Sequence, residues 1–72
     1  MTVTHFRRFL DTRPFRKFNI VLVDGRVFTV SHPDFVGATD TGWIITLWYD
    51  DGSEDAIDLL HVVSLARKGP DT

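Results

Sequence analysis

The 72-residue chain contains no cysteine, so no disulfide can stabilise its fold. A domain this short buries only about 60% of the surface of its unfolded chain and commonly needs a disulfide, a metal or a partner. No apolar run approaches the roughly 20 residues of a membrane span, and no signal peptide is visible. We therefore expect a cytoplasmic protein without a membrane partner, in which association with further copies of the chain supplies the missing stability.

Motifs of catalysis and metal binding are also lacking. The histidines His5, His32 and His61 are far apart, whereas the ligands of a zinc site usually come in closely spaced pairs. Ser31, His32 and Asp34 are close in sequence, but neighbours on one strand point to opposite faces and do not form a nucleophile–base pair. No glycine-rich phosphate loop occurs. We expect a protein that is not an enzyme, with no catalytic residue, cofactor or metal.

One cluster of acidic residues needs a separate interpretation, because carboxylates are calcium ligands. Its spacing lacks the liganding positions and the closing glutamate of a calcium loop. The cluster is therefore interpreted as a solvated turn and strand edge, where charge discourages pairing between sheets. Its members are Asp50, Asp51, Glu54, Asp55 and Asp58.

The strongest structural signal is a hairpin over residues 19–32. Two apolar runs flank Asp24-Gly25, a pair typical of a two-residue type I′ turn. This turn would place Val21 opposite Phe28, with Val21, Val23, Phe28 and Val30 on one face and Ile20, Leu22, Val27 and Thr29 on the other. Both faces would then be largely apolar, whereas a sheet with one face in water alternates more cleanly. The pattern predicts that both faces are covered, by the protein's own core, by a helix or by a second subunit.

The remaining segments predict one helix and several short strands. Phe6, Phe9 and Leu10 have the spacing of one helical stripe, so a helix is expected over residues 3–12, before Pro14. Apolar runs bounded by turn residues predict the later strands. The order favours a mainly β fold, a small antiparallel barrel with one N-terminal α-helix, as a single domain over residues 1–72. The expected later strands are residues 35–39, 43–49, 54–59 and 62–66.

This order of elements resembles the Sm-like family, a five-stranded variant of the SH3-like barrel. Ile20 to Gly25 resembles the first strand and the Asn-Gly turn of the Hfq-like RNA chaperones in that family, and Leu60 to Ser64 resembles their closing segment, with His61 at the histidine position. The resemblance implies a ring-forming SH3/Sm-like barrel that binds RNA. The segment Pro14-Phe15-Arg16-x-Phe18-x-Ile20-x-Leu22-x-Asp24-Gly25-Arg26 and the ending Ile57-Asp58-Leu59-Leu60 are also similar to a group of short bacterial proteins that carries no known function.

Charge is distributed unevenly along the chain. Residues 1–18 hold five basic residues against Asp11 alone, a net charge of +4, and the rest holds three basic and nine acidic residues, a net charge of −6. Two interpretations are open: a solvated helix face, or a surface for single-stranded RNA with Phe15 and Phe18 as stacking platforms. The candidate RNA-binding residues are Arg7, Arg8, Arg13, Arg16, Lys17 and His61.

Aromatic residues indicate where a contact surface lies. Trp43 and Trp48 fall on opposite faces of the strand over residues 43–49, so at least one of them is expected outside a single small core. An exposed tryptophan beside apolar residues marks a contact surface. The candidate interface residues are Trp43, Trp48, Tyr49, Val63 and Leu65. The sequence thus predicts a non-enzymatic homo-oligomeric binding module whose partner is itself; the alternative is an Hfq-like protein that binds single-stranded RNA through a basic N-terminal helix face.

Overall fold

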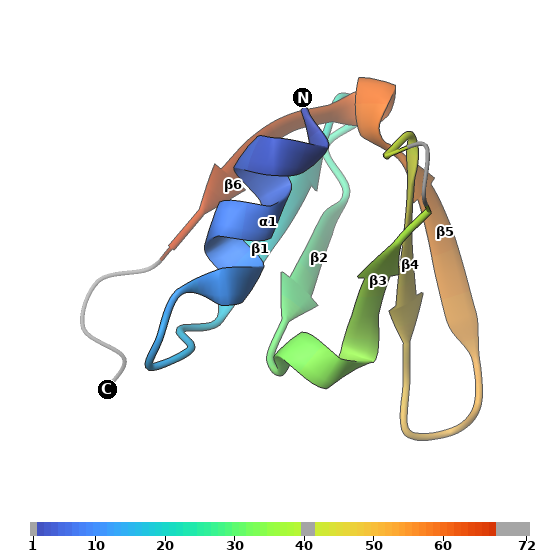
Figure 1. Cartoon of the computed structure of the whole chain (residues 1–72). Coiled ribbons are helices and arrows are strands. Elements are labelled where there is room, and N and C mark those ends of the chain that lie inside the picture. Colours follow the sequence, from blue (N-terminus) through green and yellow to red (C-terminus); the bar gives the residue numbers. More distant parts are fainter. Residues whose placement is uncertain (1, 40–41, 68–72) are drawn as a thin grey trace.

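A computed structural model (Figure 1) describes residues 2–39 and 42–67 of the chain. As expected, these residues form a mainly β structure with one N-terminal helix. Two short 3₁₀ turns, Pro33–Phe35 and Leu59–His61, interrupt the strands. The elements are the helix α1 (Val3–Asp11) and the strands β1 (Phe18–Leu22), β2 (Val27–Val30), β3 (Val36–Ala38), β4 (Ile44–Trp48), β5 (Glu54–Asp58) and β6 (Val62–Ala66).

The helix α1 docks through the predicted apolar stripe. Its first turn is capped by Thr2, whose hydroxyl oxygen accepts the backbone N–H of His5 at 3.2 Å. Phe6 is completely buried and contacts Phe18 edge-on, with ring centroids 6.0 Å apart. Phe9 also packs edge-on against Phe18, at 5.1 Å. A nine-residue helix is marginal alone, so this phenylalanine contact with β1 is what stabilises it.

The strands form two antiparallel three-stranded sheets. One has the order β2-β1-β6 and is called the β1 sheet here; the other has the order β3-β4-β5 and is called the β4 sheet. Among the described residues the strands do not close into one barrel, because the chain leaves one sheet after β2 and enters the other at β3. Residues 31–35, which include Pro33, make this break, since proline cannot donate to a strand ladder.

The register of the first hairpin differs by one residue from the predicted one. Ile20 is opposite Phe28 and Val21 is opposite Val27. The backbone N–H of Leu22 donates to the carbonyl of Arg26, and that of Gly25 donates to the carbonyl of Leu22, both at 2.9 Å. Within this turn only Gly25 has a positive φ, of 91°. The type I′ prediction is therefore wrong, because Asp24 keeps a negative φ and the turn is a three-residue loop closed by a glycine bulge.

This shift reassigns every side chain of β2, because a slip of one residue exchanges the two faces of a strand. Phe28 and Val30 face the core together with Ile20, whereas Val27 and Thr29 face outward. The predicted face sets were wrong for this strand. The core is drawn from both sheets, α1 and the second 3₁₀ turn; its buried members are Phe6, Phe18, Ile20, Leu22, Val30, Val36, Ile45, Leu47, Ile57, Leu59 and Val62.

The hairpin between β4 and β5 closes with the same turn. The backbone N–H of Tyr49 donates to the carbonyl of Ser53, and that of Gly52 donates to the carbonyl of Tyr49, both at 3.0 Å. Gly52 has a φ of 88°, the counterpart of Gly25. Within the described ranges, no helix has the length and apolar character that crossing a bilayer requires.

Candidate functional site

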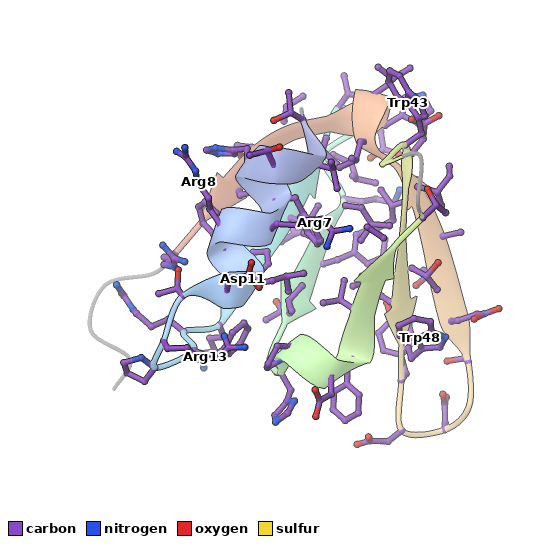
Figure 2. All side chains as sticks on the ribbon, viewed as in Figure 1. Arg7, Arg8, Asp11, Arg13, Trp43 and Trp48 are labelled. Atoms are coloured by element: carbon purple, nitrogen blue, oxygen red, sulfur yellow. The ribbon has the colours of Figure 1, made fainter. Side chains whose placement is uncertain are left out.

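The basic residues of α1 lie on its solvent side. Arg7 and Arg8 are exposed, and Figure 2 shows them pointing to opposite sides of the helix, with Asp11 further along it toward the carboxyl end. Together with Thr4 and Thr12 they line an open depression of about 540 Å³. The depression therefore presents two guanidinium groups and one carboxylate to solvent.

The other basic residues near α1 have different surroundings. The guanidinium of Arg13 donates to the carbonyls of Leu10 and Thr12, at 2.7 and 3.0 Å, so it binds the carboxyl end of the helix. Arg16 and Lys17 are exposed in the segment between α1 and β1. The predicted cationic set is thus divided between a helix face, a helix end and a connecting segment.

Arg67 has a role that the sequence did not indicate. Its guanidinium lies 4.1 Å from the ring centroid of Phe9 and donates to the hydroxyl of Thr12 at 2.8 Å. It also donates to the carbonyl of Phe9 at 3.4 Å. This residue follows β6 and ties the end of that strand to the end of α1. Its partners are more than fifty positions away, so no local pattern could have revealed the contact.

His61 lies apart from the N-terminal cations. It ends the second 3₁₀ turn, and its carbonyl accepts the backbone N–H of Val23 at 2.8 Å. Its side chain helps to line a small cavity of about 80 Å³ with Arg26, Asp55 and Asp58, and none of the five N-terminal basic residues reaches this cavity. Asp58 caps the 3₁₀ turn by accepting the N–H of Leu60 at 2.9 Å. Across residues 2–39 and 42–67, no group of three or more His, Asp or Glu side chains could hold a metal.

The outward face of the β1 sheet carries no charged side chain. Val27 is 54% exposed, Val23 beyond the end of β1 is 69% exposed, and Val63 at the bulge of β6 is 58% exposed. Two polar side chains of this face pair with each other, since the hydroxyl of Thr29 donates to the side-chain oxygen of Asn19 at 2.7 Å. We call this surface the valine face; it comprises Asn19, Val21, Val23, Val27, Thr29, Val63 and Ser64.

The candidate interface residues do not form one patch. Val63 belongs to the valine face, whereas Leu65 packs against the core. Figure 2 shows Trp43 and Trp48 at opposite ends of β4. Both are largely exposed, at 55% and 44%, which confirms that at least one tryptophan lies outside the core.

A groove between the ends of β2 and β4 gathers three aromatic side chains. Phe35, Trp48 and Tyr49 are 44%, 44% and 39% exposed and line a volume of about 200 Å³. Asp50 is the one charged residue of the lining. We call this the aromatic groove; it comprises Thr29, Val30, Ser31, Phe35, Leu47, Trp48, Tyr49 and Asp50. No local sequence pattern predicts this groove, because its parts come from three separate segments.

The aromatic side chains of the groove are held in place by other residues. The indole of Trp48 lies over Gly37, where an added Cβ would be 2.9 Å from its Cη2 atom. The hydroxyl of Tyr49 donates to a carboxylate oxygen of Asp55 at 2.7 Å. Partial burial, followed by this hydrogen bond and the charge of Asp55, raises the pKa of Tyr49 to about 12. The tyrosine therefore stays neutral and remains a hydrogen-bond donor over the physiological range.

The surroundings of the aromatic groove are acidic. Residues 27–66 contain no lysine or arginine at all, whereas seven aspartates and glutamates fall in this stretch. The groove and the whole β4 sheet belong to it. Comparisons of the chain with protein-family models, with curated proteins and with solved structures found no match.

Proposed function

We propose that this chain is a non-enzymatic binding module that acts as a homo-oligomer, with its subunits meeting at the valine face. The observation that carries the proposal is the absence of charge on that face, in a chain of which 25% of the residues are charged. Burial of apolar surface contributes about 25 cal/mol per Å². A second copy offers a surface of the same chemistry, and a two-fold contact would place the same patch on both sides.

The hydrogen bond between Asn19 and Thr29 lowers the cost of burying the valine face. A buried polar group is costly when it lacks a partner, but Asn19 and Thr29 already form a hydrogen bond with each other. The free edge of the other sheet is a poorer contact. Strand β5 carries Glu54, Asp55 and Asp58, and like charges on an edge oppose strand pairing between copies.

The strand order supports a five-stranded SH3/Sm-like barrel as the finer description of this module. Strands β2 and β3 are consecutive, each is the edge of its sheet, and only residues 31–35 separate them. We infer that they correspond to the two halves of one sharply bent strand, which would give the order β6-β1-β2/β3-β4-β5. A 3₁₀ turn joins β5 and β6, the two strands at the opposite ends of this order.

The assembly is tested by the mass of the particle in solution. We expect sedimentation equilibrium of the unmodified chain at micromolar concentration to give a mass above that of a monomer. Val27→Lys places a charge within the valine face and should yield the monomer. Ala56→Lys, an exposed position of β5 in the other sheet, is the matched control and should leave the mass unchanged. A monomeric unmodified chain at tens of micromolar would contradict the proposal.

RNA binding is the second candidate, and one observation favours it: Arg7 and Arg8 are exposed on α1 at an open depression. Contacts of such residues with phosphates release counterions, so affinity for short single-stranded RNA should fall steeply as salt rises. Fluorescence anisotropy with a labelled oligonucleotide would measure this. The double variant Arg7→Gln/Arg8→Gln should bind more weakly than the matched variant Thr4→Ala. No detectable binding at low salt would exclude this candidate.

A further inference from the structure

The aromatic side chains of the groove are held in place by other residues, and each keeps part of its surface exposed. Trp48 packs over Gly37, and Tyr49 is held by its hydrogen bond to Asp55. Phe35 contacts the ring of His32, with centroids 5.6 Å apart. Because these contacts already restrict the rings, binding of a ligand in the groove would cost the protein little further side-chain entropy.

The charge of the groove selects the sign of its ligand. The faces of aromatic rings are negative and attract cations, and Asp50 adds a carboxylate to the lining. Residues 27–66 contain no lysine or arginine, so no guanidinium or ammonium of this stretch competes for the site. Lys17 precedes the Phe18–Val30 pair and is the basic residue that the register brings to this end of β2. The groove is therefore complementary to a positively charged group.

The aromatic rings, the carboxylate and the neighbouring edge strand favour a planar cation on an extended chain. A guanidinium stacks on aromatic rings and pairs with a carboxylate, whereas an ammonium acts as a point charge. A volume of about 200 Å³ accommodates one long side chain. Thr29, Val30 and Ser31 line the groove at the end of β2, which is an edge strand, so an extended backbone can lie beside it.

We propose that the aromatic groove binds an arginine side chain presented by an extended segment of another polypeptide. The chain's own cations are poor occupants, because several are already bound within it. Arg13 donates to the carboxyl end of α1, Arg67 binds Thr12 and Phe9, and Arg26 pairs with Asp24 at 2.8 Å. This binding site shares Thr29 with the valine face but is otherwise built from different residues, and the proposal does not depend on the proposed assembly.

The test uses a five-residue peptide, acetyl-Gly-Ala-Arg-Ala-Gly-amide, and the same peptide with citrulline, which has the shape of arginine without its charge. Binding is followed by NMR through the indole N–H of Trp48. Trp43, at the other end of β4, serves as an internal reference. We expect the Trp48 signal to move and the Trp43 signal to stay, with binding of the citrulline peptide weaker by about fivefold. Equal binding of the two peptides, or equal shifts of the two indoles, would overturn the proposal.

Two variants separate the contributions of charge and aromatic ring. Asp50→Asn should weaken binding of the arginine peptide by about threefold, and Asp11→Asn, which removes an exposed charge on α1 outside the groove lining, should not. Phe35→Leu keeps an apolar side chain but removes a ring face, so it should weaken the arginine peptide and not the citrulline peptide. Equal effects of Asp50→Asn and Asp11→Asn would refute a local site.

The particle mass of the same variants tests whether another copy of this chain or a segment of another polypeptide occupies the groove. If the groove served contacts between copies, Asp50→Asn and Phe35→Leu would lower the particle mass, and the proposal of a foreign segment would be wrong. We expect both variants to keep the mass of the unmodified chain. Val27→Lys should retain peptide binding, so a failure of assembly and a failure of arginine binding can be distinguished.

Discussion

The β1–β2 hairpin and the β4–β5 hairpin turn the chain in the same way but present different surfaces. Each turn has an aspartate in its third position, Asp24 or Asp51, whose carboxylate accepts the backbone N–H two residues later, at 3.1 and 2.9 Å. Each has a glycine of positive φ in its fourth position. The outward side chains differ: the valine face is uncharged, whereas Trp48 on the β4 sheet is paired with Glu54. Turn chemistry thus sets the register, and the side chains between the turns set what each sheet can bind.

The largest expected effect tests whether the two hairpins share one core. Ile20 and Ile45 are both fully buried, one in each sheet. Replacing either by alanine should lower the free energy of unfolding by about 2–5 kcal/mol, because each leaves a cavity in a small core. Urea denaturation followed by tryptophan fluorescence would measure this, with Val27→Ala as the exposed control. A loss confined to one sheet, seen as two transitions, would show that the hairpins are independent.

The turns themselves should respond alike. An added Cβ meets no atom within 4 Å at Gly25 or Gly52, so substitution changes only the backbone energy. Gly25→Ala and Gly52→Ala should each cost about 1–2 kcal/mol, since an L-residue is strained at positive φ. Asparagine tolerates this conformation better, so the two Gly→Asn variants should cost less. Urea midpoints that differ strongly between the two sites would break the equivalence of the turns.

A smaller effect should be specific to the β4 sheet. Gly37→Ala brings a Cβ within 2.9 Å of the Trp48 indole, which must move aside. We expect a loss of about 1 kcal/mol in the free energy of unfolding and a red shift of tryptophan emission. In the background of Trp48→Ala the same substitution should cost less, because the contact is gone. Additive losses in the double variant would show that the indole does not restrict this position.

The smallest expected effect distinguishes the causes of the lowered pKa values of the two turn aspartates, Asp24 and Asp51. Hydrogen bonds lower the pKa of both below 3.8: chiefly the backbone N–H of Arg26 for Asp24, and chiefly the hydroxyl of Ser53 for Asp51. A lowered folded-state pKa gives stability that is present above the unfolded value and is lost as pH falls through the folded value. In a carboxyl NMR titration, Ser53→Ala should raise the pKa of Asp51 more than Arg26→Ala raises that of Asp24. The reverse order would contradict this assignment.

The helix and the β-rich composition of the fold could be predicted because they follow from local patterns. The stripe of Phe6 and Phe9 and the turn residues after each apolar run suffice for these elements. The register of the first hairpin could not be predicted in this way. Val23-Asp24-Gly25 is compatible with a two-residue and with a three-residue loop, and only the φ of Asp24 decides between the two. The aromatic groove depends on how Phe35 is brought beside Trp48 and Tyr49 in space.

The contact between Arg67 and α1 has a consequence for folding during synthesis on the ribosome. The helix α1 is made before the strands, but its carboxyl end is secured by a residue that follows the last strand. Strand β1 pairs with β2 nearby, but it also pairs with β6, which is made some forty residues later. Because such distant partners must close a long loop before they gain any contact, we expect the local hairpins to form first and the contacts of β6 and Arg67 with the N-terminal elements to form last.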